Sequence, residues 1–205
     1  MERTLSKSEL KDRYSVFIFD LDNTIYDERE YLSNGYKEIA KYVAEANKSG
    51  QLKEYYDYLI AEFDTRGRSM LFNKFIEHFN LTVSIHSLLQ ILRCQETQIQ
   101  MYPKSKKILD MLVNANKYIY ILTNGNVEQQ RNKVKLLGLK EQYSSIDVVY
   151  ASLFEPKPSP KALLNIINSV CAEKKDAIMI GDSEVDELTA YNANIAFINI
   201  KDIIL

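Results

Sequence analysis

VFIFDLDNT, residues 16–24, decides the fold class, because four apolar residues lead directly into two carboxylates, Asp20 and Asp22. A short apolar run of this kind is typical of a fully buried strand. Residues i and i+2 that leave a strand can point to the same side, so the two acids can converge on one spot. Like charges this close repel each other unless a cation separates them or one carboxyl is protonated. The stretch therefore predicts a magnesium site, acid/base chemistry, or both. Taken alone, an Asp-x-Asp pair after a strand is more often an ordinary turn.

A second strand-like run, YIYIL at residues 118–122, ends in Thr123-Asn124-Gly125. This turn can present side-chain and backbone donors to phosphate oxygens, and the helix predicted at 127–137 would point its N-terminus to the same place. Asn-Gly is also one of the commonest turn signals, so this stretch by itself does not decide between a phosphate site and a plain turn.

Lys157 lies between Pro156 and Pro158, which predicts a stiffened loop rather than a helix. A lysine fixed near carboxylates and a phosphoryl group would neutralise charge there. The same pattern also fits one of many surface lysines beside a helix start.

A further buried strand, predicted at 177–181, is followed by Asp182, Ser183 and Asp186. A carboxylate just beyond a buried strand can complete the oxygen shell of a magnesium ion. The competing interpretation is helix capping, since Asp182 or Ser183 could cap a helix that runs to about residue 192.

The composition is that of a folded chain with nearly balanced charge. The 205 residues are 46% hydrophobic, and the net charge is −2. This length and apolar fraction are enough for one substantial core and a smaller module. Basic residues are not concentrated, so we expect no nucleic-acid polymer as a partner. Cys94 and Cys171 lie far apart, which favours reduced thiols. Residues 1–14 have no apolar stretch of signal-peptide length, and no run in the sequence approaches the length of a membrane span. With the thiols expected to be reduced, we therefore expect a cytoplasmic protein with no membrane partner.

The periodicity of apolar residues alternates between strand-like and helix-like stretches. This alternation predicts a doubly wound parallel α/β sheet, whose ligands would bind at the carboxyl ends of the strands. The predicted strands are 15–20, 118–122, 146–150, 177–181 and 195–199, and the predicted helices are 104–115, 127–137, 160–171 and 184–192.

Residues 25–97 interrupt this pattern with apolar residues at every third or fourth position, as in Leu32, Tyr36, Ile39 and Val43. This spacing predicts an inserted bundle of about four helices. The domain division that follows is an α/β core of residues 1–24 and 98–205 and a helical insert of residues 25–97. We expect linkers at 25–30 and 95–102.

Two features of the insert could contact a substrate. Its many tyrosine and phenylalanine side chains could stack on a base or sugar, although aromatic residues at helical spacing are more often core. Arg66-Gly67-Arg68 would break a helix and could aim a guanidinium at an anion, although solvated arginines fit equally well.

Taken together and in this order, the stretches resemble the four motifs of the haloacid dehalogenase-type phosphatases. The matching residues are Asp20, Asp22 and Thr24 for the first motif, Thr123 for the second, Lys157 with Pro158 and Pro160 for the third, and Gly181, Asp182, Ser183 and Asp186 for the fourth. One departure is Asn194, where relatives commonly carry glycine, but Asn also tolerates the left-handed conformation. The resemblance implies a five-stranded Rossmann-like core and identifies the helical insert as a mobile cap.

The resemblance also implies roles for the acidic residues. Asp20 would be the nucleophile and Asp22 the acid/base. Mg²⁺ would be bound by Asp20, the backbone carbonyl of Asp22, and Asp182. Asp186 would support the metal or Lys157.

The remaining matched residues would bind the phosphoryl group. The resemblance implies that Thr123, Asn124 and Gly125 hold its oxygens and that Lys157 stabilises the charge that spreads over them in the transition state.

The function that the resemblance implies is magnesium-dependent hydrolysis of a small phosphorylated metabolite through an aspartyl-phosphate intermediate. Nucleoside monophosphates and sugar or small-acid phosphates both fit as substrates. A phosphomutase keeps both acids and passes the phosphoryl group to a sugar hydroxyl, so it stays open as an alternative. A non-catalytic phosphate-sensing or interaction module, similar in topology to receiver domains, is an alternative of another class, and the helical insert argues against it. The oligomeric state is not indicated by the sequence.

Overall fold

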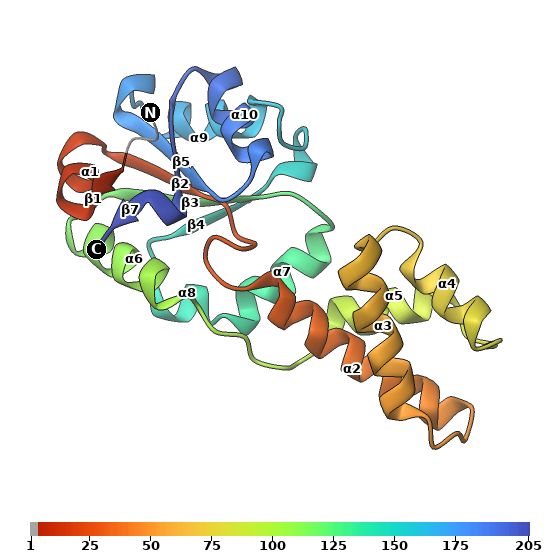
Figure 1. The fold of residues 1–205 in the computed structure, drawn as a ribbon. Coiled ribbons are helices and arrows are strands. Elements are labelled where there is room, and N and C mark those ends of the chain that lie inside the picture. Colours follow the sequence, from red (N-terminus) through yellow and green to blue (C-terminus); the bar gives the residue numbers. More distant parts are fainter. Residues whose placement is uncertain (1–3) are drawn as a thin grey trace. The chain divides into compact units, whose positions relative to one another are not determined.

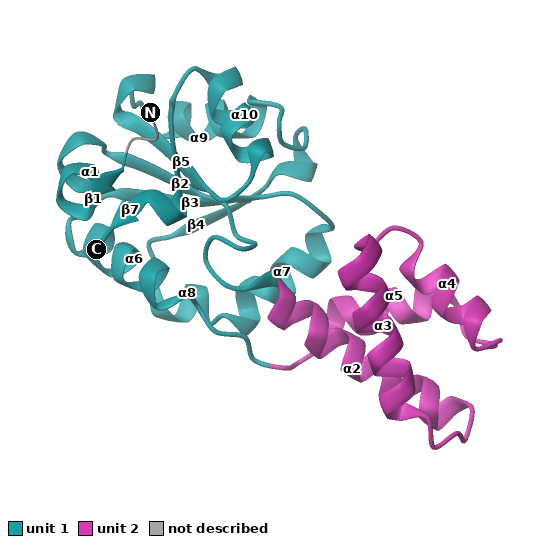
Figure 2. Ribbon diagram, viewed as in Figure 1, with its two compact units in different colours: residues 1–28, 98–205 teal, residues 29–97 magenta. Residues whose placement is uncertain are grey.

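The computed structural model describes residues 4–205 and divides the chain into two compact units (Figure 2). One unit extends to Glu28 and resumes at Gln98, and the other comprises Arg29–Thr97. The first is an α/β unit and the second is a helical unit. The helical unit is therefore an insertion whose two connections both lead back into the α/β unit.

The α/β unit is built on a five-stranded parallel sheet with the order β4-β3-β2-β5-β6. The parallel doubly wound sheet predicted from the alternating pattern is confirmed. The most buried strands are β2 and β5 at the centre, which explains why their sequences are unbroken apolar runs. The strands are β2 (Val16–Phe19), β3 (Tyr118–Thr123), β4 (Asp147–Tyr150), β5 (Ala177–Gly181) and β6 (Ala196–Asn199).

Helices cover both faces of this sheet (Figure 1). On one face lie α6 (Pro103–Asn114), α7 (Val127–Leu136) and α8 (Leu139–Gln142), and on the other lie α9 (Lys161–Ser169) and α10 (Glu184–Ala193). A core of buried side chains lies between the sheet and helices α9 and α10. It includes Val16, Ile18, Leu122, Leu163, Ile166, Met179 and Ala190. Because this packing fixes the strands, it also fixes the loops that leave their carboxyl ends.

Several short elements were not predicted. A two-stranded parallel sheet pairs β1 (Leu5–Ser6) with β7 (Ile203–Ile204), and α1 (Lys7–Arg13) follows β1 with a capping box between Ser6 and Glu9. Two-residue strands are too short to produce a recognisable period. The chain also has 3₁₀ turns at η1 (Ala151–Leu153), η2 (Lys174–Asp176) and η3 (Ile200–Asp202).

The helical unit consists of α2 (Glu28–Ala46), α3 (Leu52–Arg66), α4 (Leu71–His78) and α5 (Ile85–Cys94). Four helices were expected here, but α2 begins at Glu28, inside the segment that was expected to be a linker. The acidic start Glu28-Arg29-Glu30 lacks the apolar spacing that marks the rest of the helix, so the pattern did not reveal the true beginning.

Aromatic side chains form much of the interior of the helical unit. Tyr36 packs edge to face on Phe63 and Phe72, and Tyr55 does so on Phe75. The interpretation of these aromatic residues as core is therefore confirmed.

Gly67 ends α3, as the sequence predicted. Its φ of 68° lies in the left-handed region, where glycine is favoured. The guanidinium of Arg66 donates to Glu62 at 3.0 Å, one turn earlier in the same helix, and is half-exposed. The structure thus accounts for Arg66 by a helix surface pair.

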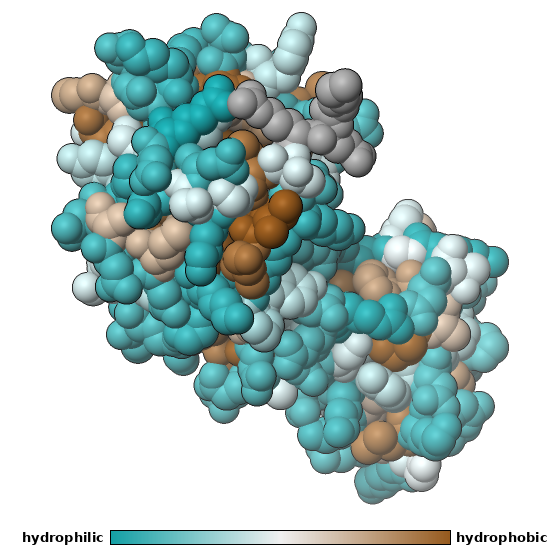
Figure 3. Space-filling model, turned by 60° about the vertical axis from the view of Figure 1, so that its left-hand side comes forward, coloured by the Kyte–Doolittle hydropathy of each residue, from teal (hydrophilic) through white to brown (hydrophobic). Residues whose placement is uncertain are grey.

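The face of the molecule in Figure 3 carries mostly hydrophilic side chains, and hydrophobic residues form smaller patches among them. Large exposed hydrophobic side chains include Tyr118, Phe154 and Tyr191. None of the helices within residues 4–205 is both long and apolar enough to cross a membrane.

Gly35 marks a close approach between α2 and the end of α5. A Cβ at this position would collide with Leu92 and lie 2.9 Å from Gln95 Nε2. We expect Gly35→Ala to lower the free energy of unfolding by about 1–2 kcal/mol, because the overpacking penalty exceeds the gain in helix propensity. Urea denaturation followed by circular dichroism measures this difference.

The matched control is Gly50→Ala, because an added Cβ there meets no atom within 4 Å. We expect that variant to stay within about 0.5 kcal/mol of the native protein. Equal stability of the two variants would show that the α2–α5 contact relaxes without penalty.

Candidate active site

The site begins where two central strands end side by side. Phe19 of β2 is paired with Ile180 of β5, and the amide of Asp20 donates to the carbonyl of Ile180 at 2.8 Å. Parallel strands present their carboxyl ends at one edge of the sheet, so the residues that follow β2 and β5 meet there. Asp20 and Asp182 are the polar residues at these two strand ends.

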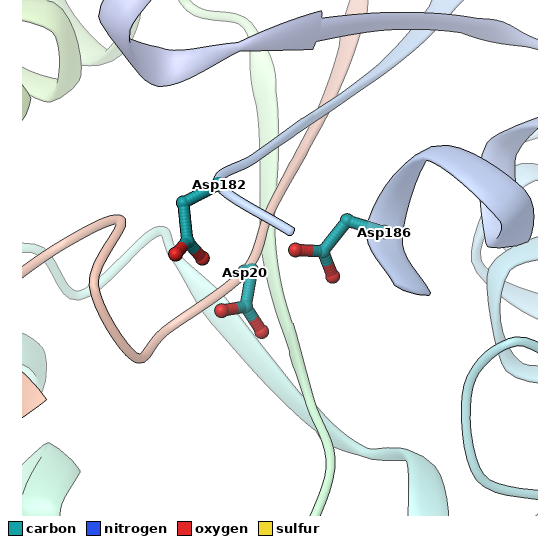
Figure 4. A group of neighbouring side chains, drawn as sticks. All are labelled: Asp20, Asp182 and Asp186. Carbon is teal, nitrogen blue, oxygen red and sulfur yellow. The ribbon is translucent and has the colours of Figure 1, made fainter. Parts of the chain in front are cut away.

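Three carboxylates gather at this edge, from Asp20, Asp182 and Asp186 (Figure 4). Each offers an oxygen, and these oxygens lie within 4.8 Å of one another. Asp20 follows β2, Asp182 follows β5, and Asp186 lies in the first turn of α10. Two residues that the sequence predicted as metal ligands are therefore together, and Asp186 joins them.

Asp186 is held at this position by local backbone geometry. Ser183 and Asp186 form a capping box at the start of α10, with Ser183 Oγ donating to Asp186 Oδ2 at 2.7 Å. Gly181 permits the approach, because a Cβ on it would lie 2.5 Å from Asp186 Oδ2. The capping interpretation of this stretch is therefore confirmed, and the same capping box places Asp186 beside Asp20 and Asp182.

Lys157 reaches the same carboxylates from the loop before α9. Its ammonium donates to Asp20 Oδ1 at 2.5 Å and to Asp186 Oδ1 at 2.6 Å, and the residue is only 7% exposed. Lys157 is therefore not a surface lysine. One ammonium is shared between two buried carboxylates.

Asn124 fixes the backbone of Lys157. Its Nδ2 donates to the Lys157 carbonyl at 3.0 Å, and its Oδ1 accepts from the Lys157 amide at 2.8 Å. The Asn124 side chain thus links the turn after β3 to the lysine loop. Next to it, Gly125 has a φ of 111°, a conformation that favours glycine.

Burial dominates the protonation of Asp20. It raises the pKa of this carboxyl to about 7, while the Lys157 ammonium acts in the opposite direction and the nearby Asp186 and Asp22 charges add to the rise. Burial and the charge of Asp186 also raise the pKa of Asp182. For Lys157, the two carboxylates outweigh burial and raise the pKa of the ammonium.

The donor set suits a hard divalent cation. Among the four groups Asp20, Asp182, Asp186 and Lys157, three are anionic when ionised and one is cationic. Carboxylate oxygens are the protein ligands that magnesium takes, usually one or two of them together with water and substrate oxygens. The residues present therefore fit Mg²⁺.

Asp22 belongs to a different cluster. Lys133 Nζ lies 2.8 and 2.9 Å from its two carboxylate oxygens, Gln130 Nε2 donates to Oδ2 at 3.0 Å, and the Tyr26 hydroxyl donates to Oδ1 at 2.5 Å. Burial alone would raise the pKa of Asp22, but the Lys133 charge and these hydrogen bonds hold that pKa below its usual value.

The Asp20 and Asp22 side chains have separate hydrogen-bond partners in this structure, although the charge of Asp22 is near enough to contribute to the raised pKa of Asp20. The strand ends at Phe19, so the alternation of a strand does not continue to Asp22, and Asn23 turns the chain with a φ of 56°. Asp20 faces Lys157, whereas Asp22 faces α7.

Two buried threonines lie near the carboxylates, Thr123 at the end of β3 and Thr24 in the loop that follows β2. Thr123 is buried, and its hydroxyl oxygen accepts from Gln130 Nε2 at 2.6 Å. Thr24 is also buried, with its hydroxyl 3.5 Å from Asp182 Oδ1. Both threonines are within the polar network around the carboxylates.

Lys133 was missed in the sequence. A signal was present, since Gln130 and Lys133 are three residues apart and share the buried face of the predicted helix 127–137 with Val134. A polar side chain on the buried face of a helix needs a hydrogen-bond or charge partner there. The spacing of residues in the sequence did not identify Asp22 as that partner.

A family model described as haloacid dehalogenase-like hydrolase matches residues 17–200. The chain belongs to this family. The match includes all the motif residues, from Asp20 to Asp186. The family resemblance seen in the sequence is therefore confirmed. No curated protein matches the hydrolase in sequence.

Solved structures with the same fold have several different activities in their descriptions. A HAD phosphatase from Thermococcus onnurineus is 24% identical, with 89% of this chain and 84% of that chain covered and a TM-score of 0.58. A candidate beta-phosphoglucomutase from Thermotoga maritima is 16% identical, with 88% and 82% covered and a TM-score of 0.65. An L-2-haloacid dehalogenase is 15% identical, with 90% and 82% covered and a TM-score of 0.61. These likenesses establish the fold.

The raised pKa of Asp20 predicts a stability difference in the absence of metal. The folded state keeps a proton on Asp20 up to about pH 7, whereas the unfolded chain loses it near the ordinary value of 3.8. Stability from this group is therefore greatest below pH 4 and falls as the pH rises to about 7. In EDTA at pH 8, we expect Asp20→Asn to be more stable than the native hydrolase by about 2–4 kcal/mol.

Urea denaturation at pH 4, 6 and 8 measures this difference, which should grow across the series. The matched control is Asp12→Asn at an exposed carboxylate, for which we expect no such growth. Magnesium should raise the stability of the native protein more than that of Asp20→Asn. A pH-independent difference would contradict the role of burial at Asp20.

Proposed function

We propose that this hydrolase is a phosphatase that cleaves phosphoric monoesters of small metabolites. The observation that carries the proposal is the second acid, Asp22, which has its own set of hydrogen-bond donors apart from the Asp20–Lys157 cluster. Cleavage of a carbon–halogen bond releases halide and needs no proton donor, whereas release of an alcohol from a phosphate ester does. The presence of Asp22 therefore favours phosphoryl transfer.

Asp20 is the nucleophile in this proposal. One of its carboxylate oxygens attacks phosphorus, the bond from phosphorus to the ester oxygen breaks, and an aspartyl phosphate forms. Lys157 supports this role, because its ammonium lies 2.5 Å from Asp20 Oδ1 and can stabilise negative charge as it spreads over the phosphoryl oxygens.

Asp22 is the acid/base. It gives a proton to the departing ester oxygen. In the second half-reaction it takes a proton from the water that attacks phosphorus, the bond from phosphorus to the Asp20 oxygen breaks, and inorganic phosphate leaves. The donors around Asp22 favour its carboxylate form, which is the form that accepts the proton from water. That proton is then available to the leaving oxygen in the next turnover.

In this proposal, the phosphoryl group binds at the end of β3 and at the lysine loop before α9. Thr123, the backbone at Asn124 and Gly125, and Lys157 would hold the phosphoryl oxygens. Mg²⁺ would be held by Asp20, the Asp22 backbone carbonyl and Asp182, with Asp186 in support. When bound, the ion supplies positive charge that offsets repulsion between the anionic nucleophile and the phosphate.

The helical unit is the proposed cap. It is inserted after Glu28, eight residues beyond the proposed nucleophile. A movement of the cap would therefore act on the loop that carries Asp20 and Asp22. A lid that excludes water strengthens electrostatic contacts and prevents side reactions. Nucleoside monophosphates and sugar or small-acid phosphates are the proposed substrate classes.

The first prediction of this proposal concerns phosphate release. We expect the native hydrolase to release phosphate from at least one member of a panel of nucleoside, sugar and small-acid phosphates, and to lose this activity in EDTA. Asp20→Asn, which keeps the size of the side chain but loses the nucleophile, should fall to background, and Asp12→Asn should match the native rate.

Each departure from this result has a definite meaning. Isomerised sugar phosphate with little free phosphate would identify a phosphomutase, consistent with one of the structures of similar fold. Retention of phosphate on Asp20 without turnover would favour a phosphate-sensing module. Full activity in Asp20→Asn would refute the assigned nucleophile.

The second prediction concerns the acid/base. We expect Asp22→Asn to lower kcat/KM for alkyl phosphates by about 10²–10⁴-fold, which is the usual contribution of a general acid. Steady-state kinetics at saturating magnesium measures this loss. A loss smaller than about threefold would exclude Asp22 from proton transfer.

A further inference from the structure

Lys133 is a buried cation that none of the four motifs contains. It is 1% exposed, and Lys133 and Lys157 are the two buried lysines within residues 4–205. A buried ammonium is strongly unfavourable unless carboxylates and hydrogen bonds compensate for its lost hydration. Lys157 has such compensation from Asp20 and Asp186. Lys133 has it from Asp22, at 2.8 and 2.9 Å, and from Glu28, at 3.4 Å.

These contacts fix the orientation of the Asp22 carboxylate. Oδ1 accepts from Lys133 and from the Tyr26 hydroxyl, and Oδ2 accepts from Lys133 and Gln130. Each oxygen therefore has two donors, and the ammonium bridges both oxygens. Rotation of the carboxyl group would break several of these bonds at once, so the donors hold one rotamer.

Helix α7 supplies two of these donors and also reaches the second motif. Gln130 and Lys133 are three residues apart, so they lie on one helix face. Besides Asp22, Gln130 Nε2 lies 2.6 Å from Thr123 Oγ1 and 2.8 Å from the Asn124 carbonyl. The same face of α7 thus sets Asp22 in a fixed relation to the turn that is proposed to bind the phosphoryl group.

We propose that Lys133 is a positioning residue for Asp22, which it orients for proton transfer with the leaving oxygen and with water. This inference rests on the proposed phosphatase function, because it assigns Lys133 a role through the proposed acid/base. Lys133 contacts neither substrate nor phosphorus in this role. Its effect should therefore appear only in steps that depend on Asp22.

Leaving-group dependence separates such a role from a general structural one. An alkyl phosphate needs a proton on its departing oxygen, whereas acetyl phosphate releases a weakly basic carboxylate and needs little help from an acid. The parameter kcat/KM is suited to the comparison, because it reports the steps up to cleavage of the ester bond and excludes the later hydrolysis of the aspartyl phosphate, which both substrates share.

We expect Lys133→Met to lower kcat/KM about 10–100-fold for the best alkyl phosphate of the panel and less than about threefold for acetyl phosphate. Lys133→Arg, which keeps the charge, should recover part of the loss. Lys135→Met, an exposed lysine on the same helix, should change neither substrate by more than about twofold.

A double-mutant cycle tests whether Lys133 acts through Asp22. In an Asp22→Asn background, Lys133→Met should change kcat/KM for the alkyl phosphate by less than about threefold, because the group that it positions is already inactive. The double variant removes both members of the Lys133–Asp22 ion pair, so neither charge of the pair is left without the other, and we expect it to stay folded even if Lys133→Met alone is destabilised. Thermal unfolding of every variant accompanies the kinetics.

Four outcomes would overturn the positioning role while leaving the phosphatase function intact. Lys133→Met could lose equal activity on both substrates, gain activity, or hydrolyse the alkyl phosphate at the native rate. Its effect could also be fully additive with that of Asp22→Asn. In each of them the native hydrolase still releases phosphate. A native protein that hydrolyses neither substrate would refute the phosphatase function itself, and with it the role of Lys133.

Discussion

The shared ion pair of Lys157 with Asp20 and Asp186 is the interaction on which the arrangement of the site depends. Asp20 follows a strand with four fully buried residues, and its own side chain is buried at the end of that strand. A carboxylate in that position needs nearby positive charge, and Lys157 provides it at 2.5 Å. Asn124, Gly181 and the capping box of α10 then serve to keep these charged groups at the right distance.

One ammonium does not balance the carboxylates around it, and this imbalance defines the chemistry of the site. Burial raises the pKa of Asp20 to about 7 despite Lys157. A divalent cation among Asp20, Asp182 and Asp186 would lower that pKa and favour the ionised form of Asp20, which is the form that the proposed nucleophile needs. By contrast, Asp22 has its own cation, Lys133, and the pKa of its carboxyl is lowered. Two acids of one motif therefore have opposite environments, which is the arrangement expected where two carboxyl groups have different tasks.

Much of the fold was readable from the sequence, because its signals are local and repeated. The apolar runs at 16–19, 118–122 and 177–181 are strands of the parallel sheet, and the spacing in residues 29–97 corresponds to four helices. Asn194 adopts the left-handed conformation at the end of α10, as its position suggested. The start of α2 and the small β1–β7 sheet were not predicted, because a polar first turn and two-residue strands carry too little periodicity.

The sequence by itself determined the sheet, the motif order and the identity of the acids, since each depends on neighbouring residues and on the rule that parallel strands end at one edge. Only the tertiary structure decided which charges pair. Asp22 and Lys133 are 111 residues apart in the chain, and Lys157 and Asp20 are 137 apart. A hydrophobic pattern records which face of an element is buried, but not what lies opposite that face. For this reason Lys133 was overlooked, and the sequence did not reveal that the carboxylate of Asp22 pairs with α7 while that of Asp20 pairs with Lys157.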